Sequence, residues 1–502
     1  MVLFRYILVF LILTLCTFSN IMAQSNSISR KIHYFSELGG VVASNNHIPF
    51  WLYANQYGTI PISSSLGYAR IGTFGIFKPD SSAKRKWSLQ YDIEIAGNAG
   101  RKTQVLLPSA FFQANLGKFY IYGGRKKEII GLVDSTLSSG SYSWSKNALP
   151  LTKIQIGTQG FIPIKFTKGL ISLNAMFAHG WFPATDSVQG SYLHQKAFYG
   201  RFGKENWKLK FYGGFIHNVQ WGGRVNYATN LIKNGKLPSS FKTYWSVLLV
   251  SRPDEMQTDT YTSFDGSNQF GNHLGSLDIG VEYYARRWQI FGYYQHPYDD
   301  KSGFALINMP DGLYGLRVKN TSKVPAHIFK VTSVLVEYLT TMDQSGPLSG
   351  SDNPGFIKYD GRDEYFNHFQ YLDGWSNQKK TIGTPFLMNR QEVREVFREI
   401  RGRKGIMWSI INNRVQLTHI AISGEFASGI KVQSRFSFSH NYGTYLVPFG
   451  KQINQFSAVT WVGWPSKILG GTEFRAAIAL DKGKLLNNSL GSLISIRKVW
   501  GR

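Results

Sequence analysis

Apolar and polar residues alternate strictly in many separate stretches of the chain. In residues 87–95, Trp, Leu, Tyr and Ile occupy every second position, and Ser, Gln, Asp and Glu fill the positions between them. Residues 207–215, 430–439 and 473–480 carry similar patterns, with Lys, Arg, Gln or Glu among the polar residues. A period of two places the apolar side chains on one face of a β-strand and the polar ones on the other. The pattern therefore predicts an all-β protein.

Loop lengths indicate how these strands are joined. Similar strands are predicted at 68–77, 110–122, 152–162, 170–180, 240–250, 276–284, 288–296, 326–342, 414–426, 452–464 and 489–500. Short turns are expected at 285–287 and 428–429, whereas long polar stretches occupy 251–275, 298–312 and 343–388. Short turns at one end and long loops at the other are typical of outer-membrane barrels. We expect a transmembrane antiparallel β-barrel of roughly 16 to 20 strands, with long extracellular loops.

A soluble propeller or sandwich is the alternative all-β architecture. A propeller requires a regular internal repeat, and the sequence has none that we detect. Several apolar faces also end in tryptophan, as an aromatic girdle at a membrane interface would require; these residues are Trp87, Trp207, Trp461, Trp464 and Trp500. We therefore favour the membrane barrel.

A short helical element is predicted at 389–402. Asn389 can cap it and Glu392 can complete a capping box, while Gly402 can end it. One face would be apolar, and the other would carry Arg390, Arg394, Arg398 and Arg401. This basic face could bind an anionic chain, or it could simply be solvated.

The N-terminus has the pattern of an exported protein. Residues 1–23 predict a cleaved signal peptide, because Arg5 precedes an apolar stretch and a small residue, Ala23, precedes the expected cut. Residues 24–66 would form an N-terminal segment, periplasmic or including the first strand, and 67–502 the barrel, with a long folded loop at 343–404. Cys16 is the only cysteine, so the mature chain would contain no disulfide or thiolate site.

Composition agrees with a membrane barrel and constrains the partners. Charged residues make up only 17% of the chain, and 51 glycines and 27 tyrosines are present. The formal net charge is +26, which attracts polyanions such as phosphorylated lipid headgroups, lipopolysaccharide or acidic polysaccharide. Export makes nucleic acid an unsuitable partner. The excess charge could interact only with lipid headgroups, or it could serve a specific polyanion.

One loop concentrates the residue types that bind sugars. Residues 363–377 read DEYFNHFQYLDGWSN, and pyranose rings stack on aromatic faces while carboxylates and amides bind their hydroxyls. The candidate polysaccharide-binding residues are Arg362, Tyr365, His368, Tyr371, Asp373, Trp375 and Lys379. The alternative is that these aromatic residues form the core of a folded loop.

Catalysis has weaker support in the sequence. Asp363, Glu364 and Asp373 could supply the two carboxylates of a glycosidase, but carboxylates are common in loops. The chain contains no HExxH pair of zinc ligands and no GxSxG nucleophile motif. We therefore predict a protein that is not an enzyme and has no catalytic residue, cofactor or metal.

Three segments together resemble the capsule-assembly Wzi family in its Bacteroidetes-type form. They are IPFWLYANQYGTIP at 48–61, SWSKNALPLTKIQIG at 143–157 and NHFQYLDGWSNQKKTIGTPFL at 367–387. The resemblance implies an 18-stranded outer-membrane barrel whose loops fold over its mouth, with a helical element near the periplasmic end. It also implies a lectin-like function in attaching capsular polysaccharide to the cell. Residues 25–60 depart from the best-known form, because they contain no recognisable helical bundle.

These arguments lead to one principal hypothesis and two alternatives. The chain would be a protein of the outer membrane of a Gram-negative bacterium that binds a capsular or other surface polysaccharide of acidic character. A porin or solute channel would share the same alternation, since a barrel of this size can enclose a pore. An outer-membrane hydrolase is the third possibility. Because the 343–388 stretch is too long and aromatic to extend freely into solvent, we expect it to fold across the barrel mouth.

Overall fold

The computed structural model describes residues 28–79, 87–101, 103–184, 187–227, 229–348, 361–402 and 405–501. The predicted signal peptide, residues 1–23, lies outside the described residues. The described chain forms a closed antiparallel β-barrel of 18 strands, as the alternation predicted. The barrel closes where β1 (Ile28–Ala43) pairs with β23 (Ser489–Gly501), with Tyr34 opposite Trp500.

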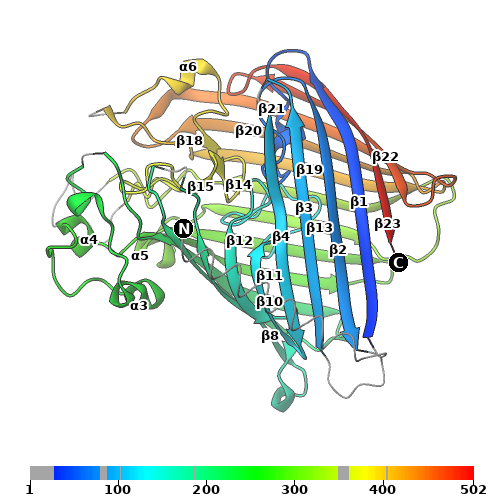
Figure 1. Cartoon of the computed structure of the whole chain (residues 1–502), viewed down its shortest axis with the longest axis horizontal. Helices are drawn as coiled ribbons and strands as arrows, with labels where there is room; N and C mark the ends of the chain where they lie inside the picture. Colours follow the sequence, from blue (N-terminus) through cyan, green and yellow to red (C-terminus); the bar gives the residue numbers. More distant parts are fainter. Residues whose placement is uncertain are drawn as a thin grey trace, which may run out of the picture.

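Each strand pairs with its neighbours along the chain, as Figure 1 shows. Both β6 and the short β7 (Ile162–Pro163) pair with β8, so together they count as one strand of the barrel. The remaining strands are β2 (Leu66–Pro79), β3 (Trp87–Ala99), β4 (Gln104–Leu116), β5 (Phe119–Arg125), β6 (Thr152–Thr158), β8 (Ile171–Trp181), β9 (Tyr192–Phe202), β10 (Leu209–Trp221), β11 (Asn272–Tyr284), β12 (Trp288–Tyr298), β13 (Gly312–Asn320), β14 (Phe329–Thr340), β19 (Val415–Phe426), β20 (Lys431–Gly443), β21 (Pro448–Pro465) and β22 (Thr472–Gly483).

The two ends of the barrel differ in the length of their connections. At one end, which we call the turn end, strands are joined by short segments such as 117–118, 285–287 and 427–430. At the other, the loop end, the connections include 44–65, 126–151, 222–271 and 341–414. β1 begins and β23 finishes at the turn end. The loop end therefore contains most of the chain outside the wall.

The outer wall is apolar, as the alternation predicted. On β22, Phe474 and Ile478 are exposed while Ala477 and Asp481 are buried on the inner face. On β20, Phe436 and Phe438 are exposed and Ser437 is buried. Side chains point alternately to opposite faces of a sheet, so one face of each strand covers the outside of the barrel and the other lines its interior.

The predicted tryptophan girdle is largely present at the turn end. Trp207, Trp464 and Trp500 are exposed there, and partly exposed Trp87 begins β3 at the same end. Trp461 was assigned wrongly to this girdle. It shares its face of β21 with buried Val459, and packs against the interior core. An odd separation from Trp464 places it on the inner face.

The prediction of a strand at 240–250 was wrong, because these residues form helix α3 (Phe241–Leu249). Phe241, Trp245 and Leu249 are four residues apart, a spacing that satisfies both the period of a strand and the period of a helix. Ser240 resolves the ambiguity locally: its side chain accepts a hydrogen bond from the Thr243 N–H at 3.1 Å, which caps the helix.

The helix predicted at 389–402 is reduced to α6 (Glu395–Arg398). The Glu392 carboxylate accepts the Asn389 N–H at 3.0 Å, so half of the capping box forms. Arg394 is extended, however, with φ −56° and ψ 152°, and its N–H donates to the Leu485 carbonyl at 2.9 Å. This tertiary hydrogen bond replaces a helical one and prevents a continuous helix.

The other short elements also belong to the connections. They are α2 (Phe50–Tyr53), α4 (Ser263–Ser267), α5 (Lys301–Phe304), the one-turn 3₁₀ segments at Lys165–Thr167 and Lys233–Gly235, and the strand pairs β15 (Ser376–Asn377) with β16 (Lys380–Thr381) and β17 (Met388–Asn389) with β18 (Ile410–Asn412). All the described α-helices lie at the loop end (Figure 1). None of the described helices is long and apolar enough to cross a membrane.

Long loops fold into the barrel and share one hydrophobic core with its wall. Phe50 and Trp51 of α2 contact the Phe386 ring, at centroid distances of 4.9 and 5.9 Å. The same cluster contains Trp375 from the 341–414 loop and inward-facing Leu335 of β14. Because segments from several loops pack against inner-wall residues, the loop end of the barrel is filled with side chains.

Candidate functional site

The aromatic residues of 363–377 form part of that buried core. Tyr365 and Trp375 are fully buried. The Trp375 indole N–H donates to the Ser143 carbonyl at 2.8 Å, and the Tyr365 hydroxyl donates to Asp311 at 3.1 Å. Tyr371 is also buried and donates to the Gly222 carbonyl at 3.2 Å. In this structure these rings stabilise the loop and present no exposed surface on which a sugar could stack.

The polar residues of this segment hold the loops together. Buried Glu364 accepts the Leu446 N–H at 2.6 Å and the Asn413 side-chain N–H at 3.3 Å, and burial raises its pKa to about 7. Asp373 accepts the Ser187 N–H at 2.5 Å. These carboxylates therefore bind different partner loops rather than a common cavity.

The three remaining candidates lie in separate places. His368 accepts the Gln370 N–H at 3.2 Å, and burial lowers its pKa to about 3, so the ring is neutral at pH 7. The Arg362 N–H donates to the Gly346 carbonyl at 2.9 Å. Lys379 is exposed and lines a large cavity at the loop end. The structure thus brings only Lys379, of the seven predicted residues, to that cavity.

This basic cavity has a volume of about 760 Å³, within the range of ligand sites in proteins. Four loop-end connections form it: the 44–65 loop, the short connection between β3 and β4, the 126–151 loop and the 341–414 loop. Its lining contains five cationic side chains and a single carboxylate, Glu399. The cationic residues are Arg101, Lys379, Lys380, Arg390 and Arg398.

Local hydrogen bonds fix the orientation of two polar side chains in the cavity. Arg390 donates through Nε to the Trp408 carbonyl at 3.0 Å and through Nη1 to the Ile400 carbonyl at 2.9 Å. Its buried Nη2 has no hydrogen-bond partner among the described residues. Asn377 likewise donates to the Leu149 carbonyl at 2.6 Å, while its Oδ1 lacks such a partner in the described chain. Buried polar atoms without partners are rare in proteins, and here they provide a donor and an acceptor beside the cavity.

Burial changes the protonation of other groups around the cavity. Lys380 donates to the Ile60 carbonyl at 3.1 Å and lies 4.5 Å from the centre of the Tyr53 ring. Burial lowers the pKa of Lys380, while the charge of Glu392 opposes this effect. Burial lowers the pKa of His47, and the positive charge of Arg398 adds to the shift. His47 is therefore mostly neutral at pH 7.

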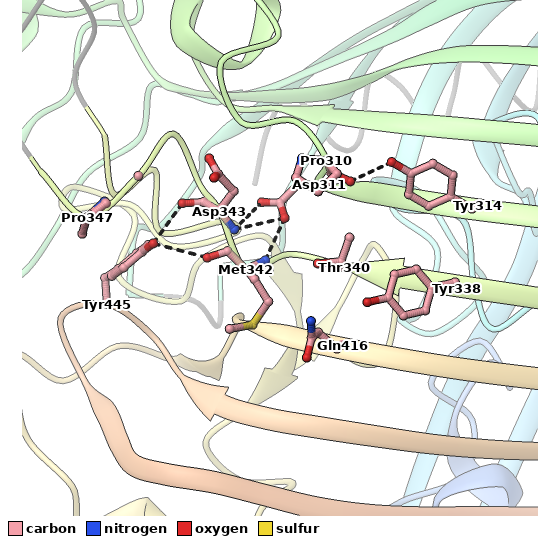
Figure 2. A pocket seen from close by; sticks show the side chains of 11 residues that line it. Pro310, Asp311, Tyr314, Tyr338, Thr340, Met342, Asp343, Pro347, Gln416 and Tyr445 are labelled. Carbon is pink, nitrogen blue, oxygen red and sulfur yellow. Dashed lines mark hydrogen bonds between the residues drawn. The ribbon is translucent and has the colours of Figure 1, made fainter.

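A second cavity, which we call the tyrosine groove, opens at the outer wall (Figure 2). Its volume is about 540 Å³. Tyr338 shares its face of β14 with exposed Val336, and Tyr314 shares its face of β13 with exposed Leu316. Both tyrosines therefore point away from the barrel interior. The groove is lined by aromatic rings, by Gln416 and by Asp311 and Asp343, so its chemistry differs from that of the basic cavity.

Asp311 organises the chain segment above this groove. Its buried carboxylate accepts backbone N–H groups from Met342, Asp343 and Gln344 at 2.8 to 3.1 Å. The Tyr445 hydroxyl donates to the Asp343 carbonyl at 3.0 Å, and Figure 2 shows these contacts around the groove. Burial raises the pKa of Asp311 to about 6. Its carboxylate is occupied by the loop backbone and acts as a structural group.

Two cationic residues of the basic cavity were predicted from the sequence, but as part of a basic helix face. Arg390 and Arg398 were expected on the basic face of a helix, and both line the cavity although that helix is only one turn long. Arg394 instead donates to the Leu486 and Gly483 carbonyls, each at 2.7 Å. Arg101 carried no local signal, because it follows β3 and meets the other residues only after the barrel closes. Within the described part of the chain, no cluster of three His, Cys, Asp or Glu residues could hold a metal ion.

Comparisons with known proteins identify a shared fold. No protein-family model matches the chain, and no curated protein matches it. Among solved structures, it is similar to Escherichia coli Wzi, an outer-membrane protein involved in group 1 capsule assembly and a carbohydrate-binding β-barrel. The identity is 12%, the TM-score 0.54, and the match covers 92% of this chain and 83% of that one.

Outer-membrane proteins of another kind align less well. Pseudomonas aeruginosa OccK5 has 6% identity, a TM-score of 0.45 and coverage of 94% of this chain and 98% of its own. Acinetobacter baumannii OccAB4 has 9% identity, a TM-score of 0.45 and coverage of 95% and 99%. The closed 18-stranded barrel and its similarity to Wzi show that the chain has the fold of an outer-membrane β-barrel.

Proposed function

We propose that this protein binds an exported acidic polysaccharide at the surface of a Gram-negative cell and helps to assemble or anchor a capsule or exopolysaccharide layer. The basic cavity is the observation on which the proposal rests. In this role the chain is a binding protein and performs no catalysis. Its other partners are outer-membrane lipid and lipopolysaccharide, which surround the apolar wall.

The orientation of the barrel supports this role. Outer-membrane barrels have short periplasmic turns and longer extracellular loops. The turn end, where β1 begins and β23 finishes, therefore faces the periplasm, and the loop end faces the cell exterior. The basic cavity lies among the loops and is accessible to a polysaccharide outside the cell.

The chemistry of the cavity suits an anionic saccharide. Guanidinium groups bind carboxylate and phosphate groups through directed N–H donors, whereas an ammonium group provides a compact charge. Arg101 and Lys379 are exposed and line the cavity. Uronate or phosphate groups could bind these two cations. The similarity to the carbohydrate-binding barrel Wzi is consistent with this proposal.

A solute channel is the alternative function. Against it stands the core shared by the loops and the inner wall, in which Phe50, Trp51 and Trp375 are fully buried. An open pore would require these segments to leave the barrel. We therefore favour a docking platform over a conduit.

The decisive experiment measures binding of the purified barrel to capsular polysaccharide from its own host. The Arg101→Ala/Lys379→Ala double variant removes two exposed cavity cations. If each contact is worth about 0.2–1 kcal/mol, the Kd should rise about 2- to 30-fold. Biolayer interferometry with immobilised polysaccharide would measure this change at two salt concentrations.

The Lys118→Ala/Lys208→Ala double variant provides the matched control, since it removes two exposed positive charges at the turn end. The proposal predicts that this control binds like the wild-type protein. An equal loss of affinity in both variants would indicate binding through net charge alone and would refute the assigned site. Unchanged binding in the Arg101→Ala/Lys379→Ala variant would refute it as well.

A further inference from the structure

The outer wall changes in character beneath the 222–271 loop. Phe198 of β9 and Phe211 of β10 are exposed apolar residues. His194 and Lys196 share the face of β9 that carries Phe198, and His217 shares the face of β10 that carries Phe211. All three lie nearer the loop end than these phenylalanines. These positions alternate with the inner wall, so their side chains point outward. A charged residue in an outward position of a membrane barrel is costly where it faces lipid.

Helix α3 and its flanking loop cover this polar section of wall. Lys196 donates through Nζ to the Leu248 carbonyl at 2.6 Å, at the last turn of the helix. The Tyr244 ring packs edge-on against His194, with 5.9 Å between ring centroids. Val247 belongs to a buried cluster with Trp221, which ends β10. The inner face of α3 is thus attached to the wall by both polar and apolar contacts.

The outer face of the same helix is apolar. Phe241, Trp245 and Leu249 recur every four residues and are 73%, 47% and 69% exposed. Residues spaced by four lie on one side of an α-helix. A contiguous apolar surface on a helix marks an interaction with a protein or a membrane.

The position of this face identifies its partner. The buried cluster that holds α3 includes Val219 and Trp221, which share the outward face of β10 with exposed Phe211. Figure 1 shows α3 among the connections at the loop end, at the left of the view. Exposed Trp181, at the loop end of β8, also lies on the outer wall. The apolar face of α3 therefore adjoins the part of the barrel that faces lipid, and exposed Trp245 and Trp181 are of the residue type that forms an interfacial aromatic belt.

We propose that α3 is a lateral membrane anchor whose Phe241, Trp245 and Leu249 side chains insert into the outer leaflet. The helix places an apolar surface where the wall beneath it is polar. Lys242, with 86% of its side chain exposed, pairs with Asp254 at 3.3 Å and would remain on the aqueous side. The proposal depends on membrane location and is independent of polysaccharide binding.

Site-directed spin labelling tests this insertion. Cys16, the only cysteine in the sequence, is expected to be removed with the signal peptide, so the mature chain provides a cysteine-free background for the single variants Trp245→Cys and Lys242→Cys. Each labelled protein is reconstituted in vesicles of phosphatidylethanolamine and phosphatidylglycerol. Power saturation then compares collisions of the label with oxygen, which concentrates in lipid, and with a water-soluble nickel chelate.

The label at 245 should collide mainly with oxygen, and the label at 242 mainly with the nickel chelate. Leu249→Cys provides a second position on the apolar face and should behave like 245. Equal access of the chelate to 245 and 242 would refute insertion. Low collision rates with both reagents at 245 and 249 would also refute it, because they would indicate burial against protein, such as a second copy of the chain.

Discussion

Trp375 provides the sharpest test of how the loop end is stabilised. Its ring is fully buried between Trp144 and Phe182, at centroid distances of 6.1 and 5.9 Å. Its indole N–H donates to the Ser143 carbonyl at 2.8 Å. The structure therefore predicts that Trp375→Ala weakens the folded loop and affects polysaccharide binding only through that weakening.

The magnitude follows from the burial of the ring. Truncating a buried tryptophan to alanine costs about 3–5 kcal/mol, which includes the lost packing and the cavity left behind. Trp375→Phe retains most of the apolar contact but leaves the Ser143 carbonyl unpaired, at a cost of about 1–3 kcal/mol. Trp375→Ala should therefore destabilise the loop more than Trp375→Phe does.

Hydrogen exchange in detergent micelles measures the effect locally. Two backbone amides beside the ring report on the loop. The Trp375 backbone N–H donates to the Phe366 carbonyl at 2.7 Å, and the Ser145 backbone N–H donates to the Ile382 carbonyl at 2.8 Å. If exchange follows local opening, a loss of 3–5 kcal/mol should accelerate it on the order of 10²- to 10³-fold or more. Amides of the barrel wall, such as those of β22, serve as the internal control and should change little.

One result would refute this reasoning. If Trp375→Ala exchanged at the wild-type rate while its polysaccharide affinity fell, the indole would have to contact the ligand directly. The ring would then belong to a sugar-binding surface, as one interpretation of the sequence proposed. Restored affinity in Trp375→Phe without restored protection of the amides would indicate the same.

Three further predictions follow from the loops. Burial raises the pKa of Glu364 from 4.5 to about 7, so between these two pH values the folded loop binds more protons than the open loop. The stability of the folded loop should therefore fall as the pH rises through this range. Glu364→Gln should flatten this pH dependence in hydrogen exchange measured from pH 5 to 8. Asp311→Ala should accelerate exchange at Met342, Asp343 and Gln344, because the carboxylate accepts their N–H groups, and unchanged protection would refute its structural role. In planar bilayers, the purified barrel should show little steady conductance and a variant lacking residues 361–402 a larger one; a large wild-type conductance would favour a channel.

The sequence determined the wall of the barrel because the alternation of apolar and polar residues is a local pattern. A strand between lipid and a polar interior must alternate, and this pattern is visible in each segment without its neighbours. The three stretches expected to be long loops, 251–275, 298–312 and 343–388, all fall mainly in loop-end connections. The family resemblance pointed to the same barrel and to loops over its mouth.

Tertiary contacts decided what local patterns left ambiguous. Residues 241–249 fit both a strand and a helix, and their capped helix packs against Val219 and Trp221 of β10 on the outer wall. Around Arg394, a hydrogen bond to Leu485 on a distant connection interrupts the expected helix. Neither contact can be inferred from residues within a few positions of the segment.

The candidate site depended most strongly on the closed fold. The sequence located a loop rich in aromatic residues and carboxylates, but whether a ring faces solvent depends on what packs against it. Trp375 is covered by residues more than 190 positions earlier in the chain, Trp144 and Phe182. Arg101 and Lys379 meet at one cavity only because the barrel brings four connections to the same end. Local alternation thus determined the strands, whereas closure of the barrel decided which loop residues became core and which became the binding surface.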